Sequence, residues 1–136
     1  PSFIARGSGR ILNVSSIASL VPGPWQATYF AAKAYVTSLT LAFSEELRGT
    51  GVTATVVLPG GMRTGFEAAA KLEGTGLAAQ LTQSPDDVAR RSYEAMLRGR
   101  RKLIAGTPLL QRLLLRLVPF APMAFVLRVV ARLHKR

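Results

Sequence analysis

Two short apolar runs, separated by a long stretch of helix-forming residues, constrain the fold of this chain most strongly. Residues 10–16 (RILNVSS) are largely apolar and end in small polar side chains, whereas residues 52–58 (VTATVVL) are rich in β-branched side chains and precede Pro-Gly-Gly. Runs of this kind are typical of buried parallel strands. Residues 27–48 between them have apolar side chains at helical spacing, and Gly49 and Gly51 follow as a stop signal. The sequence therefore predicts a strand–helix–strand unit.

The same alternation continues toward the C-terminus. Residues 84–87 (SPDD) form a good helix start, because a capping serine, a proline and two acids all favour the first turn. We expect this helix to reach about residue 98, and residues 101–105 to form a third short strand. Helices alternating with about three strands predict an α/β fold, half of a doubly wound parallel sheet. We assign residues 1–106 to this half-domain and residues 107–136 to a basic, amphipathic helical tail.

Composition and charge narrow the classes of function. A chain that is 49% hydrophobic and 18% charged is globular rather than disordered. It contains no cysteine, and its one histidine is His134, so we expect neither a disulfide framework nor a metal site. The net charge of +11 is unevenly placed, because residues 95–136 hold ten Lys or Arg and no acid. This asymmetry indicates either an anionic partner or a solvated basic surface.

The first residues suggest that the chain is part of a longer gene product. There is no initiator Met, and the first strand follows almost at once. A three-stranded half sheet would also leave an open edge strand. No signal-peptide pattern is visible, so we expect a cytoplasmic location, with the inner face of the membrane as an alternative through the tail.

Ser16, Tyr29 and Lys33 form the most informative constellation. Tyr29 and Lys33 are four residues apart on the predicted helix, so their side chains emerge on one face. An ammonium close to a phenol favours the phenolate, which suits the phenol to proton transfer in carbonyl reduction or alcohol oxidation. Ser16, at the end of the neighbouring strand, can hydrogen-bond a substrate oxygen. A Tyr-x-x-x-Lys pair alone is more often an aromatic side chain packed beside a solvated charge.

The wider context of these residues resembles the short-chain dehydrogenase/reductase family segment by segment. The segment GRILNVSS ends at Ser16, thirteen residues before Tyr29, and Phe-Ala-Ala-Lys33 completes the next motif. Val57-Leu-Pro-Gly60 ends the second strand, and Thr64 lies beyond it. The resemblance covers residue 1 to about residue 105, and the tail more loosely. It implies a Rossmann-like fold and an oxidoreductase that uses NAD or NADP.

The resemblance implies a role for each catalytic residue. Tyr29 would donate or accept the proton, and Ser16 would orient and polarise the substrate carbonyl. Lys33 would stabilise the phenolate and hydrogen-bond the nicotinamide ribose. Asn13 is expected to be structural, and Ser15 faces the other way along a regular strand, so we assign it no function.

The resemblance also implies a loop beside the cofactor. Pro59, Gly60 and Met62 would lie next to the nicotinamide, with the Met62 main chain meeting its carboxamide. Thr64 would add a hydroxyl near the carboxamide or the phosphates. Arg63 could meet a phosphate, although an exposed loop arginine is more often only a solvated charge.

Other parts of the family pattern are missing from the sequence. No Gly-x-x-x-Gly-x-Gly loop is present to bind the phosphates, and no residue after a second strand chooses between NAD and NADP. We therefore expect the 136-residue chain alone to bind the cofactor poorly and to be inactive, and its full-length parent to be active.

The residues after the Pro-Gly loop and the tail leave alternatives open. Residues 64–83 are expected to hold one or two short helices whose apolar side chains form either a lid over an apolar substrate or an ordinary packing surface; these side chains are Phe66, Leu72, Leu77 and Leu81. The tail, residues 108–136, is expected to form two amphipathic helices broken near Pro119 and Pro122. It would either bind anionic lipid or pack on the substrate cleft or on a partner subunit. Nucleic acid fits less well, because the tail has few aromatic residues and no nucleic-acid module.

Two functions from different classes follow from the sequence. The first is a carbonyl reductase or secondary-alcohol dehydrogenase that forms a homo-oligomer when complete and acts on a small-molecule substrate. The alternative is a non-catalytic membrane-surface or scaffold protein that keeps the fold.

Overall fold

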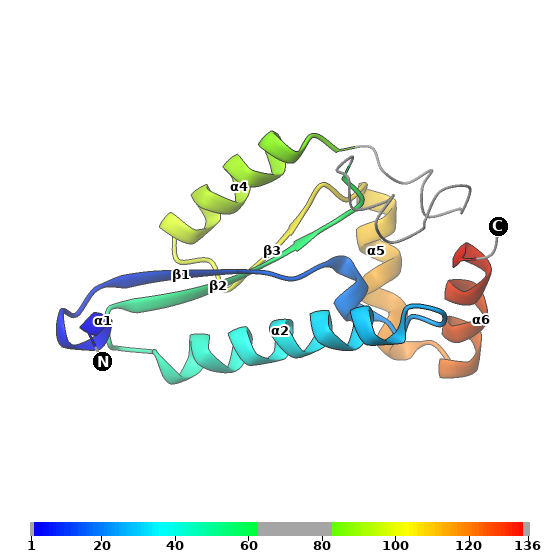
Figure 1. The fold of residues 1–136 in the computed structure, drawn as a ribbon, viewed down its shortest axis with the longest axis horizontal. Helices are drawn as coiled ribbons and strands as arrows, with labels where there is room; N and C mark the ends of the chain where they lie inside the picture. Colours follow the sequence, from blue (N-terminus) through cyan, green and yellow to red (C-terminus); the bar gives the residue numbers. More distant parts are fainter. Residues whose placement is uncertain (1, 63–82, 135–136) are drawn as a thin grey trace.

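The computed structural model describes residues 2–62 and 83–134 and contains a three-stranded parallel sheet. Its strands are β1 (Gly9–Val14), β2 (Val52–Pro59) and β3 (Lys102–Ala105), in that spatial order (Figure 1). Gly9 pairs with Val52 and Val14 with Val57, and Val56 pairs with Lys102 at the start of β3. The prediction of an α/β half sheet is confirmed.

Two helices cover the two faces of the sheet (Figure 1). Helix α2 (Ala27–Glu46) lies on one face and connects β1 to β2, and helix α4 (Pro85–Leu97) lies on the other and precedes β3. Successive side chains of a strand point to opposite faces, so a central strand between two helices is buried on both sides. This explains why every β2 residue except Thr53 is buried.

The core is divided between these faces. On the α4 side, Val57 packs with Val88 and Ala105, and Leu12, Met62 and Leu103 surround this cluster. The neighbouring β2 residues Val56 and Leu58 are fully buried. Alternate side chains of β2 therefore belong to two apolar layers, one beneath each helix.

Several element boundaries differ from those predicted. The first strand ends at Val14 rather than at residue 16, because Ser16 instead caps the short 3₁₀ helix η1 (Ile17–Leu20). A first helix α1 (Ser2–Ala5) was also not predicted. The second strand begins after a turn at Gly51, whose φ of 77° and close approach to the Gly7 carbonyl leave no room for a Cβ atom.

The tail forms two helices joined by a turn. Helix α5 (Leu109–Leu117) is followed by the 3₁₀ helix η3 (Val118–Phe120) and by helix α6 (Met123–His134), close to the predicted break. Val126 and Val130 of α6 pack on Phe30 of α2. The helix α6 thus packs on α2 of the same chain. Among the described residues, no helix combines the length and the apolar character needed to cross a bilayer.

Candidate functional site

The predicted catalytic residues lie at one end of the molecule, where β1 ends and α2 begins (Figure 1). Ser16 directly follows the strand segment at Val14 and Ser15, and Tyr29 and Lys33 lie in the first two turns of α2. In an open parallel sheet, the carboxyl ends of the strands are the usual place for a ligand. The fold therefore places these three residues at the edge of the sheet where chemistry is expected.

Lys33 is held across the end of β1. Its ammonium donates a hydrogen bond to the carbonyl oxygen of Val14, with an Nζ–O distance of 3.2 Å. The same Nζ lies 5.8 Å from the centre of the Tyr29 ring. Since an ammonium has three N–H donors, the bond to Val14 fixes the charge beside the phenol and leaves donor capacity toward a ligand.

Ser16 is fixed through its oxygen rather than its hydrogen. Its Oγ accepts a hydrogen bond from the Ala18 backbone amide at 3.1 Å, which caps η1. A hydroxyl that accepts such a bond retains its own O–H as a donor. The side chain is half-buried, so its position is defined by the turn and is not that of a freely rotating surface serine.

Tyr29 packs against apolar side chains. Its ring is half-buried and meets the Phe30 ring edge to face, with centroids 6.0 Å apart and an interplanar angle of 76°. Tyr29 also packs against the cluster of Phe30, Val126 and Val130, so α6 forms part of the surroundings of the phenol. The C-terminal tail thus belongs structurally to the end of the molecule that carries the candidate site.

A polar seam, which the sequence did not reveal, joins β1 to α2. We define it as Asn13, Ser15, Lys33, Thr37 and Thr40. Ser15 Oγ donates to the Lys33 carbonyl oxygen at 2.8 Å and lies 2.7 Å from Thr37 Oγ1, and Asn13 Nδ2 donates to Thr40 Oγ1 at 2.9 Å. The structural role expected for Asn13 is therefore borne out by its contacts. Ser15, to which we assigned no function, instead tethers the backbone of Lys33.

The signal for this seam was present in the sequence as a spacing. Lys33, Thr37 and Thr40 recur at intervals of four and three residues, so they share one face of α2. Polar residues on the inward face of a buried helix require partners, and the polar end of β1 supplies them. The pattern could have predicted the seam only with knowledge of which face of α2 meets β1.

The residues expected beside the cofactor occupy the end of β2. Pro59 is its last residue and is buried. The Gly60 amide donates to the Ala105 carbonyl at 2.8 Å, and a Cβ atom at Gly60 would lie 2.5 Å from the Gly106 carbonyl oxygen, so only glycine fits this crossing of two chains. Met62 packs its side chain against the Val57 cluster.

Part of the predicted site falls outside the described residues. Thr64 and Arg63 lie there, as do the four apolar side chains expected to cover the substrate, namely Phe66, Leu72, Leu77 and Leu81.

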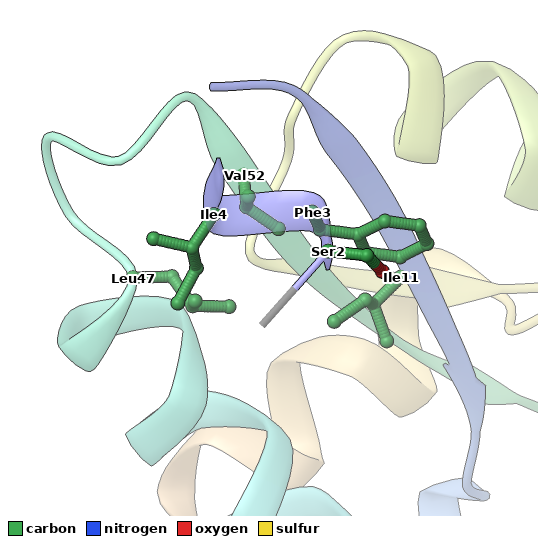
Figure 2. A pocket seen from close by; sticks show the side chains of 6 residues that line it. All are labelled: Ser2, Phe3, Ile4, Ile11, Leu47 and Val52. Carbon is green, nitrogen blue, oxygen red and sulfur yellow. The ribbon is translucent and has the colours of Figure 1, made fainter. Parts of the chain in front are cut away.

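An apolar groove of about 200 Å³ lies elsewhere, beside α1 and the start of the strands. Figure 2 shows that the side chains of Phe3, Ile4 and Leu47 surround it. Its other lining residues are Ser2, Ile11 and Val52. These residues belong to α1, to the first halves of β1 and β2 and to the turn after α2, at the opposite end of the sheet from Ser16. Since the groove contains no ionisable side chain and is remote from the three polar residues, we do not assign the chemistry to it.

Comparison with known proteins identifies the family. Residues 1–73 match the short chain dehydrogenase family, and this is more than half of the chain. The chain therefore belongs to the short-chain dehydrogenase family. A 3-oxoacyl-(acyl-carrier-protein) reductase from Synechocystis sp. is 46% identical to it over 62 residues, which are 46% of this chain and 25% of the reductase.

Solved structures of other proteins have a similar fold. A 7beta-hydroxysteroid dehydrogenase has a TM-score of 0.75 at 24% identity, over 96% of this chain and 50% of its own length. An actinorhodin polyketide ketoreductase, solved with NADPH, has a TM-score of 0.64 at 24% identity, over 76% of this chain and 48% of its own. The chain thus spans between a quarter and a half of the length of these proteins.

Proposed function

We propose that the protein containing this chain is an NAD(P)-dependent oxidoreductase that interconverts a carbonyl compound and a secondary alcohol through Ser16, Tyr29 and Lys33. The observation that carries this proposal is the position of the Lys33 ammonium, which is anchored on the Val14 carbonyl and lies 5.8 Å from the centre of the Tyr29 ring. The phenol, the ammonium and the Ser16 hydroxyl lie at the carboxyl end of one strand.

The proposed proton transfer follows from these positions. In the direction of reduction, the Tyr29 hydroxyl gives its proton to the carbonyl oxygen as negative charge develops there. The Ser16 O–H donates a hydrogen bond to the same oxygen, while its Oγ stays fixed by the Ala18 amide. Lys33, whose ammonium lies 5.8 Å from the centre of the Tyr29 ring, would place a positive charge near the phenolate that remains. In the direction of oxidation, the Tyr29 phenolate takes the proton from the alcohol.

The described residues fit one part of a dinucleotide. When bound, the nicotinamide supplies or accepts the hydride. Lys33 has N–H donors beyond the one used by Val14 and could hold the ribose hydroxyls, and Pro59, Gly60 and the Met62 main chain would hold the carboxamide side. No glycine-rich phosphate loop occurs in these 136 residues. We accordingly propose that this chain provides the nicotinamide half of the binding site, and the sequence does not choose between NAD and NADP.

The similar proteins support this class of reaction. One relative is a 3-oxoacyl reductase, and one structure of the same fold is a polyketide ketoreductase solved with NADPH. Both names describe carbonyl reduction. We propose that the substrate is a small, apolar carbonyl compound or alcohol.

The outer face of α2 supports pairing of the complete protein. Ala31, Ala34 and Ser38 are exposed there, and the Tyr35 and Phe43 rings are also exposed. Small residues allow two helices to approach closely, and exposed aromatic rings favour burial. We propose a homo-oligomer that pairs through this face. Ala34→Arg should shift the molar mass measured by light scattering toward the monomer, whereas an unchanged mass would contradict pairing at α2.

Replacing Tyr29 by Phe tests the proton transfer. In the full-length protein, we expect Tyr29→Phe to lower kcat by about 100-fold or more, because general acid–base catalysis contributes a factor of about 10²–10⁴. The matched control is Tyr35→Phe on the same helix, whose ring is 67% exposed and whose hydroxyl is not part of the site. Reduction of a carbonyl substrate by NADPH and by NADH, followed by loss of cofactor absorbance, measures both variants.

Two results would count against this proposal. Turnover of Tyr29→Phe close to that of the wild type would remove the phenol from the mechanism. A full-length protein that binds neither cofactor would favour the non-catalytic membrane-surface or scaffold protein instead.

A further inference from the structure

Helix α5 turns its apolar side outward. Its leucine face consists of Leu109, Leu110, Leu113, Leu114 and Leu117, all of which are exposed; Leu109 is 73% exposed and Leu117 59%. Their spacing of three and four residues places them on one side of the helix. The side turned toward the rest of the protein carries Gln111, Arg112 and Leu115, which are half-buried. This is the reverse of an ordinary surface helix, which directs its apolar stripe inward.

The exposed apolar surface continues beyond α5. The Phe120 ring in the turn after α5 is 85% exposed, and Met123 and Phe125 at the start of α6 are also exposed. Isolated exposed leucines need no explanation, but five exposed leucines on one side of one helix mark a surface that meets another apolar phase. The helix α6 packs on Phe30 through Val126 and Val130, and it follows α5 through the turn of η3.

The charges beside this surface are all positive. Arg116 on α5 and Arg128 and Arg132 on α6 are exposed, and there is no acidic residue after Glu94 in the sequence. Within residues 2–62 and 83–134, every ion pair lies between residues 45 and 101, where Glu45, Asp87 and Glu94 are already paired with arginines. Within the part of the chain that the structure describes, no carboxylate therefore forms an ion pair with the arginines of α5 and α6.

We propose that the leucine face of α5, with the arginines of α5 and α6, docks onto the surface of an anionic phospholipid bilayer. The leucines would enter the boundary between headgroups and acyl chains, and the arginines would reach the lipid phosphates, as in interfacial amphipathic helices. A helix of nine residues is too short to span the bilayer, so α5 would lie in the interface. This inference is independent of the proposed activity, because it concerns binding alone.

A second copy of the chain is a poorer occupant of the same surface. Pairing two leucine faces would bring the arginines of both copies together, and like charges across an interface oppose association. An anionic bilayer instead offers negative charge next to an apolar layer. The chemistry of the surface therefore favours lipid over self-association.

Vesicle sedimentation tests the apolar part of the proposal. The protein should sediment with vesicles of phosphatidylglycerol and phosphatidylcholine in equal parts. The double variant Leu113→Gln with Leu117→Gln keeps the charge and, by removing two inserted side chains, should lower the partition coefficient by about tenfold or more. Leu97→Gln is the matched control, because Leu97 is a 52% exposed leucine near the end of α4, away from the tail. All these leucines are exposed, so circular dichroism should show an unchanged fold.

A second pair of variants tests the charge. Arg116→Gln and Arg128→Gln should each weaken binding to the mixed vesicles about fivefold, because each basic residue near an anionic surface contributes about 1 kcal/mol. Arg100→Gln, before β3 at the other end of the sheet, should have little effect. Pure phosphatidylcholine vesicles should bind the wild type more weakly and show no difference between the arginine variants.

Three outcomes would overturn the proposal. The first is a wild type that stays in the supernatant with the mixed vesicles. The second is a double leucine variant that sediments like the wild type. The third is a shift of the double leucine variant to a smaller species in gel filtration without any vesicle binding by the wild type, which would assign the leucine face to a protein contact.

Discussion

At the scale of single residues, the polar seam between β1 and α2 explains how Lys33 is held in place. The Lys33 carbonyl accepts from Ser15, and its ammonium donates to Val14, so both ends of the residue are tied to the end of one strand. Buried polar groups are stable only when they are paired, and here each partner comes from the facing element. The neighbouring hydroxyls therefore differ: Ser15 binds α2, whereas Ser16 caps η1 and is proposed to bind the substrate.

Ser15→Ala should measure the contribution of this seam. The substitution leaves the Thr37 hydroxyl without the Ser15 oxygen and removes the donor to the Lys33 carbonyl, in a buried environment. We expect a loss of about 1–3 kcal/mol in the free energy of unfolding, measured by urea titration. Ser38→Ala on the exposed side of α2 is the control and should change it by less than about 0.5 kcal/mol. Equal effects of the two variants would contradict a structural role for Ser15.

At the scale of elements, α2 connects three parts of the molecule. Its inward polar residues meet β1, its exposed face carries Tyr35, and its first turns meet α6 through Phe30. Both polar and apolar side chains of α2 therefore face inward. The contact between Phe30 and α6 is what fixes the tail against the candidate site.

Phe30→Ala should therefore loosen the tail as well as the core. Removing a buried phenylalanine typically costs about 3–5 kcal/mol, and the ring lies between α2 and the two valines of α6. We expect this loss in urea unfolding, together with faster amide hydrogen exchange in α6. Tyr93→Ala on α4 is the control, because that ring is 57% exposed and lies outside the face proposed for pairing. Protection of α6 that is unchanged in Phe30→Ala would show that the helix is held by other contacts.

At the scale of the whole molecule, we propose that the sheet supplies one half of a dinucleotide site. The three described strands carry the residues proposed for the nicotinamide end, and the chain covers only part of the length of its relatives. A dinucleotide normally lies across the ends of strands from both halves of such a sheet. The tail adds a second property at the same end, a basic surface with exposed leucines.

The 136-residue chain alone should accordingly bind NADPH too weakly to measure at micromolar concentrations and should show no turnover, because it has no phosphate-binding loop. Titration of NADPH fluorescence measures the binding, and the full-length protein is the positive control. Tight binding or turnover by the isolated chain would contradict our division of the site. Vesicle binding by the same sample would be unaffected by this result.

The sequence by itself determined the order of strands and helices and the placement of Ser16, Tyr29 and Lys33 around the end of the first strand. Both follow from local properties, since periodicity defines an element and spacing along one helix or after one strand defines which side chains lie close together. It did not determine the end of β1, because the capping bond that the Ala18 amide donates to Ser16 Oγ competes there with strand pairing.

Only the tertiary structure decided which face of each helix meets the rest of the molecule. The polar seam depends on the packing of α2 against β1, and the leucines of α5 are exposed because the other side of that helix, with Gln111, Arg112 and Leu115, faces the protein. An amphipathic pattern defines two faces of a helix but not which of them is buried, because that choice depends on contacts between residues far apart in the chain. For this reason the sequence left the two interpretations of the tail balanced, whereas the structure shows that α6 packs on Phe30 and that the leucines of α5 are exposed.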